Sequence, residues 1–100
     1  MLLRTYRFRV PKKNERRMVA FMKREALPVV RRMPAVRAAF FLRSLEKKQE
    51  YMWVTLWTSE AARRRTAVRP AWKALGQAEH KGGFFSGAPQ ARHFQVLLRC

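Results

Sequence analysis

Hydrophobic and polar residues alternate over Leu2–Val10, and this period of two predicts a half-buried β-strand. Apolar residues then recur at helical spacing over the segment Asn14–Met33, with Asn14 placed to cap the helix. Pro28 lies inside this helical pattern and removes one backbone hydrogen bond, so we expect a kink there. Pro34 ends the helix.

Two further apolar segments, Val36–Leu45 and Tyr51–Trp57, flank a short polar turn and predict a β-hairpin. Ser59 then caps a second helix, and Pro70 restarts a helical segment.

Gly82 and Gly83 end this last helical segment, and Arg92–Arg99 alternates again as a final strand. The order of elements over residues 1–100 is strand, helix, strand, strand, helix, strand. This order predicts a single α+β domain with the ferredoxin-like βαββαβ fold and an antiparallel four-stranded sheet.

Alternation assigns each strand residue to one of two sheet faces. The face expected to meet the helices is mostly apolar and consists of Tyr6, Phe8, Val10, Phe40, Leu42, Met52, Val54, Leu56, Phe94, Val96 and Leu98. The opposite face mixes aromatic, guanidinium and hydroxyl groups and consists of Thr5, Arg7, Arg9, Phe41, Arg43, Trp53, Thr55, Trp57, His93 and Gln95. A shift of one residue in this assignment exchanges the faces. Such an exposed surface is typical of an interface, with a second sheet or with stacked nucleic-acid bases.

The chain carries 23 basic and 6 acidic residues, a formal net charge of +17. This charge favours attraction to polyanions, but a bias towards Arg with a solvated basic surface is the preferred explanation. The third strand lacks the basic residue and glycine of the usual RNA-recognition signature, so nucleic acid is an open but less favoured partner.

Cys100 is the only cysteine, which excludes an intrachain disulfide and fits a reducing cytoplasm. No apolar run is long enough for a signal peptide or a membrane span, so we expect a cytoplasmic protein without membrane contact. The two histidines and one cysteine are too widely spaced for a zinc site, and no metal is expected.

Several segments together resemble the antibiotic-biosynthesis monooxygenase domain. The first strand contains Arg-Phe-Arg-Val (residues 7–10) before a proline, and the first helix contains Leu-Pro-Val (27–29). The most specific segment is Tyr51–Ala61, in which a strand-ending Trp is followed after one residue by Ser-Glu-Ala. The resemblance spans nearly the whole chain.

This resemblance implies a homodimer that pairs two sheets into an α+β barrel, with Arg7, Arg9, Trp53 and Thr55 in the dimer interface. It also implies a small organic ligand in a cavity between sheet and helices. Haem degradation is not expected, because the positions that carry that branch's Asn, Trp and His hold Thr5, Thr66 and Gly76.

The family that the chain resembles includes cofactor-independent oxygenases. Such an enzyme needs a base, groups that hold an anion and an apolar pocket. His80 and His93 are the candidate catalytic bases, since they alone titrate naturally near neutral pH. The candidate substrate-binding residues are Tyr6, Tyr51, Trp57 and Trp72. Each also has a simpler interpretation: a solvated helix end for His80, a surface position for His93, and packing for the tryptophans. The six glutamates fall on helix flanks or turns, so no paired acid and base are expected.

The resemblance implies a monooxygenase-like protein that oxygenates a small hydroxylated aromatic or polyketide-like molecule without a cofactor. A basic nucleic-acid-binding module and a non-catalytic, ligand-binding dimer are the alternatives.

Overall fold

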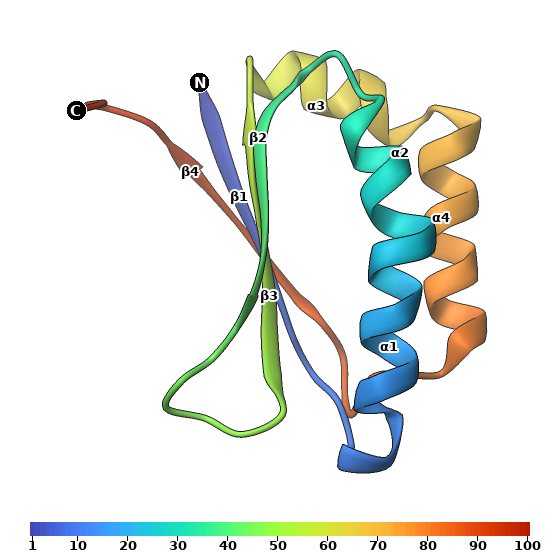
Figure 1. The fold of residues 1–100 in the computed structure, drawn as a ribbon. Helices are drawn as coiled ribbons and strands as arrows, with labels where there is room; N and C mark the ends of the chain where they lie inside the picture. Colours follow the sequence, from blue (N-terminus) through green and yellow to red (C-terminus); the bar gives the residue numbers. More distant parts are fainter.

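Helices cover one face of a four-stranded sheet, and the other face is left open (Figure 1). The computed structural model describes residues 1–100. The strands are β1 (Leu2–Arg9), β2 (Val36–Arg43), β3 (Glu50–Trp57) and β4 (Gln90–Gln95). The helical elements are η1 (Lys12–Asn14), α1 (Glu15–Phe21), η2 (Met22–Ala26), α2 (Leu27–Arg31), α3 (Glu60–Ala67) and α4 (Pro70–Gly82).

The strands lie in the order β2-β3-β1-β4, and every neighbouring pair is antiparallel. The two central strands are therefore the first and third along the chain, which is the arrangement of a ferredoxin-like fold. The predicted fold class and order of elements are confirmed. No helix is both long enough and apolar enough to cross a membrane.

The first long helix is continuous but irregular. Five residues of π-helix, η2, separate α1 from α2, and Pro28 is the second residue of α2. Proline has no N–H to donate, and its ring clashes with the carbonyl four residues earlier. The widened turn just before Pro28 accommodates both effects, so the irregularity predicted at Pro28 is centred slightly earlier.

Two helix ends follow their expected chemistry, but the predicted cap at Asn14 is wrong: Asn14 precedes α1, and its side chain makes no capping hydrogen bond and instead donates to the backbone carbonyls of residues 83 and 84. The Ser59 hydroxyl accepts a hydrogen bond from the backbone N–H of Ala62 at 3.0 Å, which caps α3. Gly83 adopts a left-handed conformation, with φ of 60°, directly after α4. A side chain is disfavoured in that conformation, so glycine suits this position.

The final strand differs from its predicted bounds, because β4 ends at Gln95. Gln95 pairs with Leu2, and the N–H of Val96 makes a last bond to the carbonyl of Met1. Residues 96–99, which the alternating pattern included in the strand, lie outside the ladder. The predicted burial of Val96 and Leu98 on the helix side is wrong; Leu98 is exposed.

The face assignment is correct for β1 and wrong for the other strands. In β3 the buried residues are Tyr51, Trp53, Thr55 and Trp57, whereas the sequence pattern favoured the alternate set Met52, Val54 and Leu56. Both sets are apolar, so alternation alone does not distinguish them. The larger aromatic set fills the layer beneath the helices.

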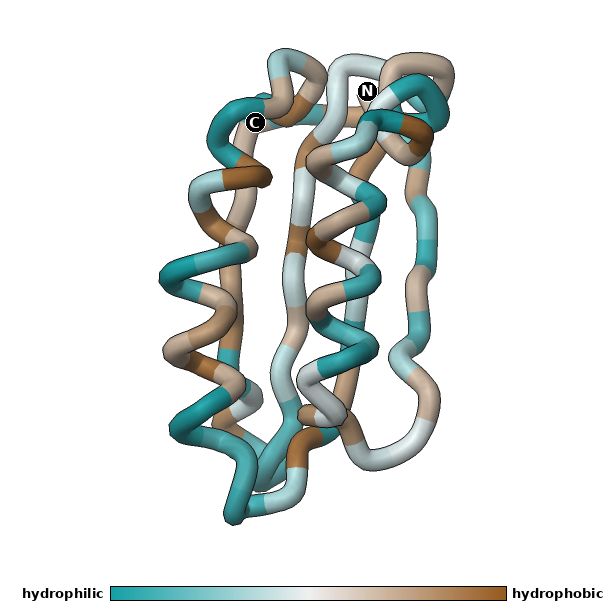
Figure 2. The backbone as a smooth tube through the Cα atoms, turned by 90° about the vertical axis from the view of Figure 1, so that its right-hand side faces the viewer, coloured by the Kyte–Doolittle hydropathy of each residue, from teal (hydrophilic) through white to brown (hydrophobic).

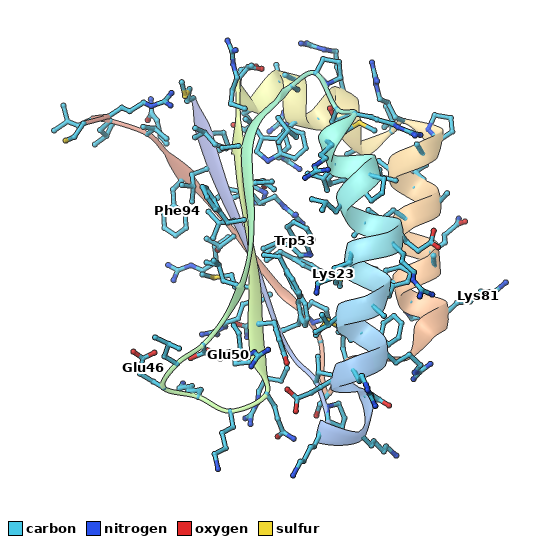
Figure 3. All side chains as sticks on the ribbon, in the orientation of Figure 1. Lys23, Glu46, Glu50, Trp53, Lys81 and Phe94 are labelled. Carbon is cyan, nitrogen blue, oxygen red and sulfur yellow. The ribbon has the colours of Figure 1, made fainter.

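The same exchange applies to β2 and β4. Phe41 packs on the core, while Phe40 is 58% exposed and Leu42 is also exposed. Trp53 projects from the sheet toward the helices, and Phe94 projects from the opposite side (Figure 3). The open face of the sheet therefore carries more apolar side chains than the sequence pattern predicted.

The core lies between the sheet and the first long helix. Its buried cluster consists of Phe8, Val10, Met18, Met22, Ala26, Tyr51, Trp53 and Phe84. Hydrophilic segments recur along the helices and alternate with the apolar positions (Figure 2). This alternation is typical of helices with one face on a core and one face in water.

Candidate functional site

A cavity of about 260 Å³ lies between the sheet and helix α4. Alternate residues of β1 and β3 form its floor, α4 forms one wall, and the first long helix adds two small apolar side chains. The lining residues are Arg4, Tyr6, Ala26, Val30, Trp53, Thr55, Trp72, Lys73, Leu75, Gly76 and Glu79. The lining combines aromatic rings with a few polar groups, which is the usual composition of a small-molecule pocket.

The wall from α4 follows helical spacing. Trp72, Leu75, Gly76 and Glu79 are separated by three, one and three residues, so they share one helix face. Gly76 has no side chain and leaves open space on this face. A carboxylate one turn beyond it therefore reaches the cavity.

Trp57 holds two lining residues in place without lining the cavity itself. Its indole N–H donates to the Thr55 hydroxyl at 2.8 Å. Its ring contacts Trp72 edge-on, with ring centres 5.5 Å apart. Only 1% of Trp57 is exposed, so this pair is fixed by packing.

Glu79 is a carboxylic acid in an unfavourable place for a charge. Burial raises its pKa from 4.5 to about 7, and the opposing attraction of Arg4 is smaller. No ion pair within 4 Å joins Glu79 to a cation. Near neutral pH the carboxyl group is therefore divided between its acidic and basic forms, as a general base requires.

Arg4 and Tyr6 supply the polar groups opposite Glu79. The guanidinium of Arg4 lies 5.1 Å from the centre of the Tyr6 ring, within range of a cation–π interaction. Burial, followed by the Glu79 charge, raises the pKa of Tyr6 to about 12. The Tyr6 hydroxyl thus stays protonated at neutral pH and is available as a hydrogen-bond donor.

The four predicted substrate-binding residues occupy different places. Tyr6 and Trp72 line the cavity, and Trp57 lies directly behind it. Tyr51 lies outside it, in the core, where its ring packs against those of Phe8 and Phe41. The Tyr51 hydroxyl donates to Glu15, which gives it a structural partner.

Neither histidine proposed as a base lines the cavity. His80 is exposed in the last turn of α4, the solvated position that its neighbours suggested. His93 is exposed on β4, where it pairs with Arg4 across the ladder. Partial burial, and then the charges of Arg63 and Arg4, lower the pKa of His93.

Trp53 and Thr55 are wrongly placed by the sequence pattern. Both are buried beneath the helices and line the cavity, so they are not on the face available to a second sheet. Arg7 and Arg9 do lie on the open face and are exposed. With Trp53 and Trp57 buried, the open face also lacks the indole rings on which bases were expected to stack.

No cluster of three or more His, Cys, Asp or Glu side chains is positioned to hold a metal ion. The polar groups of the cavity are one carboxylate, two cations and two hydroxyls. This set is suited to proton transfer and to the binding of an anion.

No protein-family model matches the chain, and no curated protein matches its sequence. Solved structures do match. SnoaB, a cofactor-independent oxygenase from Streptomyces nogalater, is 19% identical with a TM-score of 0.79, over 98% of this chain and 94% of SnoaB. Rv0793 from Mycobacterium tuberculosis is 13% identical with a TM-score of 0.80, over 98% and 96%. A structure named antibiotic biosynthesis monooxygenase is 12% identical with a TM-score of 0.78, over 98% and 100%.

The chain has an antibiotic-biosynthesis-monooxygenase-like fold. The likeness covers nearly the whole chain on both sides of each comparison, which confirms the fold that the sequence motifs implied. At these identities the likeness establishes architecture alone, and the chemistry of the domain depends on its own residues.

Two residues of the cavity were missed by the sequence analysis. Glu79 was assigned to a helix flank, although its spacing from Trp72 and Leu75 places it on their apolar helix face. Arg4 was not assigned to a face, although alternation along the strand places it on the same face as Leu2 and Tyr6. In both cases a charged residue on an otherwise apolar face was the sequence feature that indicated a functional residue.

Glu79 should make the stability of the domain depend on pH. Its pKa is higher in the folded chain than in the unfolded chain, so the folded state binds the proton more tightly and loses stability as pH rises from about 4.5 to about 7. We expect the wild type to lose about 2–3 kcal/mol of unfolding free energy over this range. Glu79→Gln should not show this loss. Urea unfolding at a series of pH values measures both.

Glu25→Gln is the matched control, because Glu25 is exposed on the helical segment η2. It should leave the wild-type pH dependence unchanged. Equal pH dependence in wild type and Glu79→Gln would contradict the assignment of a buried, high-pKa carboxyl group to Glu79.

Proposed function

We propose that this protein is a monooxygenase that oxidises a small hydroxylated aromatic molecule without a cofactor. The observation that carries the proposal is the Glu79 carboxylate, with a pKa of about 7, inside a cavity lined by aromatic rings. The fold supports it, since SnoaB, a cofactor-independent oxygenase, shares the architecture.

The cavity suits a flat, small ligand. Its volume of about 260 Å³ lies just below the range of about 300–1,000 Å³ that is usual for small-molecule sites. Trp53 and Trp72 offer ring surfaces from the sheet and from α4, respectively. An aromatic substrate held against these rings would be shielded from water on the sheet side.

In the proposed reaction, ionised Glu79 accepts a proton from the phenol or from an activated CH₂ group of the substrate. The positive charge of Arg4 and the hydroxyl of Tyr6 stabilise the resulting anion. The anion transfers one electron to O₂, and the two radicals combine to form a carbon-bound peroxide. Loss of water then leaves a carbonyl group, so one oxygen atom enters the product, the other becomes water, and Glu79 has returned its proton.

Oxygen uptake with naphthol- and anthrone-type substrates tests this function. Because Glu79 must be ionised, kcat/KM should rise with pH up to about 7 and then level off. Glu79→Gln should lower kcat at least about 100-fold, the usual effect of removing a general base, while substrate still binds.

Glu25→Gln should retain wild-type activity, because it removes an equal charge at an exposed site. Binding without oxygen consumption across the panel would refute the oxygenase and leave a ligand-binding protein. Full activity in Glu79→Gln would refute the role of the carboxylate.

We also propose that the protein is a homodimer joined through the open face of the sheet. This face carries Leu3, Phe40, Leu42, Met52, Val54, Leu56 and Phe94. Phe40 and Phe94 are 58% and 42% exposed in the single chain. Exposed apolar side chains gathered on one sheet face, here together with Arg7 and Arg9, are unfavourable in water, and a second copy with the same face would cover them.

Molar mass in solution, measured by light scattering after size-exclusion chromatography, tests the dimer. We expect twice the chain mass of 11.9 kDa for the wild type. Val54→Glu in the centre of the open face, or Phe94→Glu near its edge, should give a monomer, because each places a charge in the interface. Val68→Glu, at an exposed position after α3, should remain dimeric. A monomeric wild type would refute this arrangement.

A further inference from the structure

Four glycines occur in the chain, and the structure explains three of them. Gly83 and Gly87 have φ of 60° and 78°, a left-handed conformation that side chains disfavour. A Cβ atom at Gly82 would clash with the ring of Phe84. Gly76 has neither reason, because its φ is not positive and a Cβ atom there would meet no other part of the chain within 4 Å. The fold therefore does not require glycine at position 76.

Glycine at position 76 is also unfavourable for the local structure. Gly76 lies in the middle of α4, a helix of 13 residues. Glycine in a helix interior is less stable than alanine, because it loses more backbone freedom on folding. The chain thus keeps a helix-destabilising residue where a side chain would fit. This combination indicates a requirement for open space rather than for stability.

The space beside Gly76 is the mouth of the cavity. Of the residues that line the cavity, only Lys73 and Gly76 are exposed, and they lie three residues apart on α4. The same two residues border a shallow depression on the surface of α4. The floor, by contrast, is closed by the buried side chains of Trp53 and Thr55. A ligand larger than the cavity would therefore extend out of it over Gly76.

We propose that Gly76 determines which ligands the cavity accepts, because it leaves the mouth open for an apolar extension of an aromatic substrate. The fused rings of the substrate lie against Trp53 and Trp72, and the extension crosses the backbone of α4 at Gly76. This inference rests on the proposed function and specifies its substrate class. The preferred substrate is a fused-ring phenol with an apolar substituent, rather than a bare bicyclic phenol.

Calorimetric binding of 2-naphthol and of its 6-phenyl and 7-phenyl derivatives, measured without oxygen, tests the proposal. The phenyl group adds apolar surface and leaves the hydroxyl in place. Wild type should bind one of the derivatives about tenfold more tightly than 2-naphthol, because part of the added ring is removed from water against α4. Gly76→Val should weaken binding of that derivative at least about tenfold, because a branched side chain fills the mouth. Binding of 2-naphthol should change little.

Gly76→Ala tests whether the fold needs glycine at this position. Alanine is the best helix former and its Cβ atom has open space here, so this variant should unfold at a higher urea concentration than the wild type. It should weaken binding of the phenyl derivative less than Gly76→Val does, because its side chain is smaller. A lower urea midpoint would show that packing requires the glycine and would overturn the proposal.

Ala74→Val is the matched control, because Ala74 is exposed on the same helix and does not line the cavity. It should bind all three ligands as the wild type does. The proposal is wrong if no ligand binds, if neither phenyl derivative is preferred, or if Gly76→Val weakens all three ligands equally.

The binding measurements separate this inference from the proposed reaction. A preference for a phenyl derivative that Gly76→Val abolishes, without oxygen uptake on any of the ligands, would support the open mouth and refute the oxygenase. Oxygen uptake with 2-naphthol, and no preference for either derivative, would do the opposite.

Discussion

The register of β3 is the constraint on which the rest of the structure depends. Burial of its odd-numbered side chains places Trp53, Thr55 and Trp57 under the helices and leaves Met52, Val54 and Leu56 on the open face. A shift by one residue would reverse both sets. The cavity floor, the support that Trp57 gives to Trp72, and the apolar surface offered to a second copy all follow from this one choice.

The same arrangement of sheet and helices places two charged side chains at the cavity. Glu79, on the face of α4 toward the sheet, and Arg4, on the face of β1 toward the helices, are both partly buried without forming an ion pair. Burial therefore disfavours the ionised form of each group. A carboxyl group whose pKa is near neutral pH, and a guanidinium group without an acceptor, both reduce the stability of the protein when no ligand is bound. In the proposed reaction, both groups act on a bound aromatic molecule, which Glu79 deprotonates and Arg4 stabilises as an anion.

Elements and fold could be predicted because they depend on local chemistry. Ser59 and Gly83 mark helix ends by capping and by backbone conformation, and the order of elements leaves few topologies. The faces of β2 and β3 could not be predicted from alternation, because Phe40 and Phe41, or Trp53 and Val54, are apolar on both sides. The site was predictable only in part, since Tyr6 and Trp72 are common core residues and Glu79 reaches it from α4, a helix whose position depends on packing.

The central claim is that Glu79 is a buried carboxyl group poised to exchange a proton at neutral pH. The most direct test is an NMR titration of the ¹³C side-chain carboxyl resonance of Glu79, assigned by comparison with Glu79→Gln. The structure predicts a midpoint at about pH 7. A midpoint near 4.5, the ordinary value for glutamate, would contradict the account.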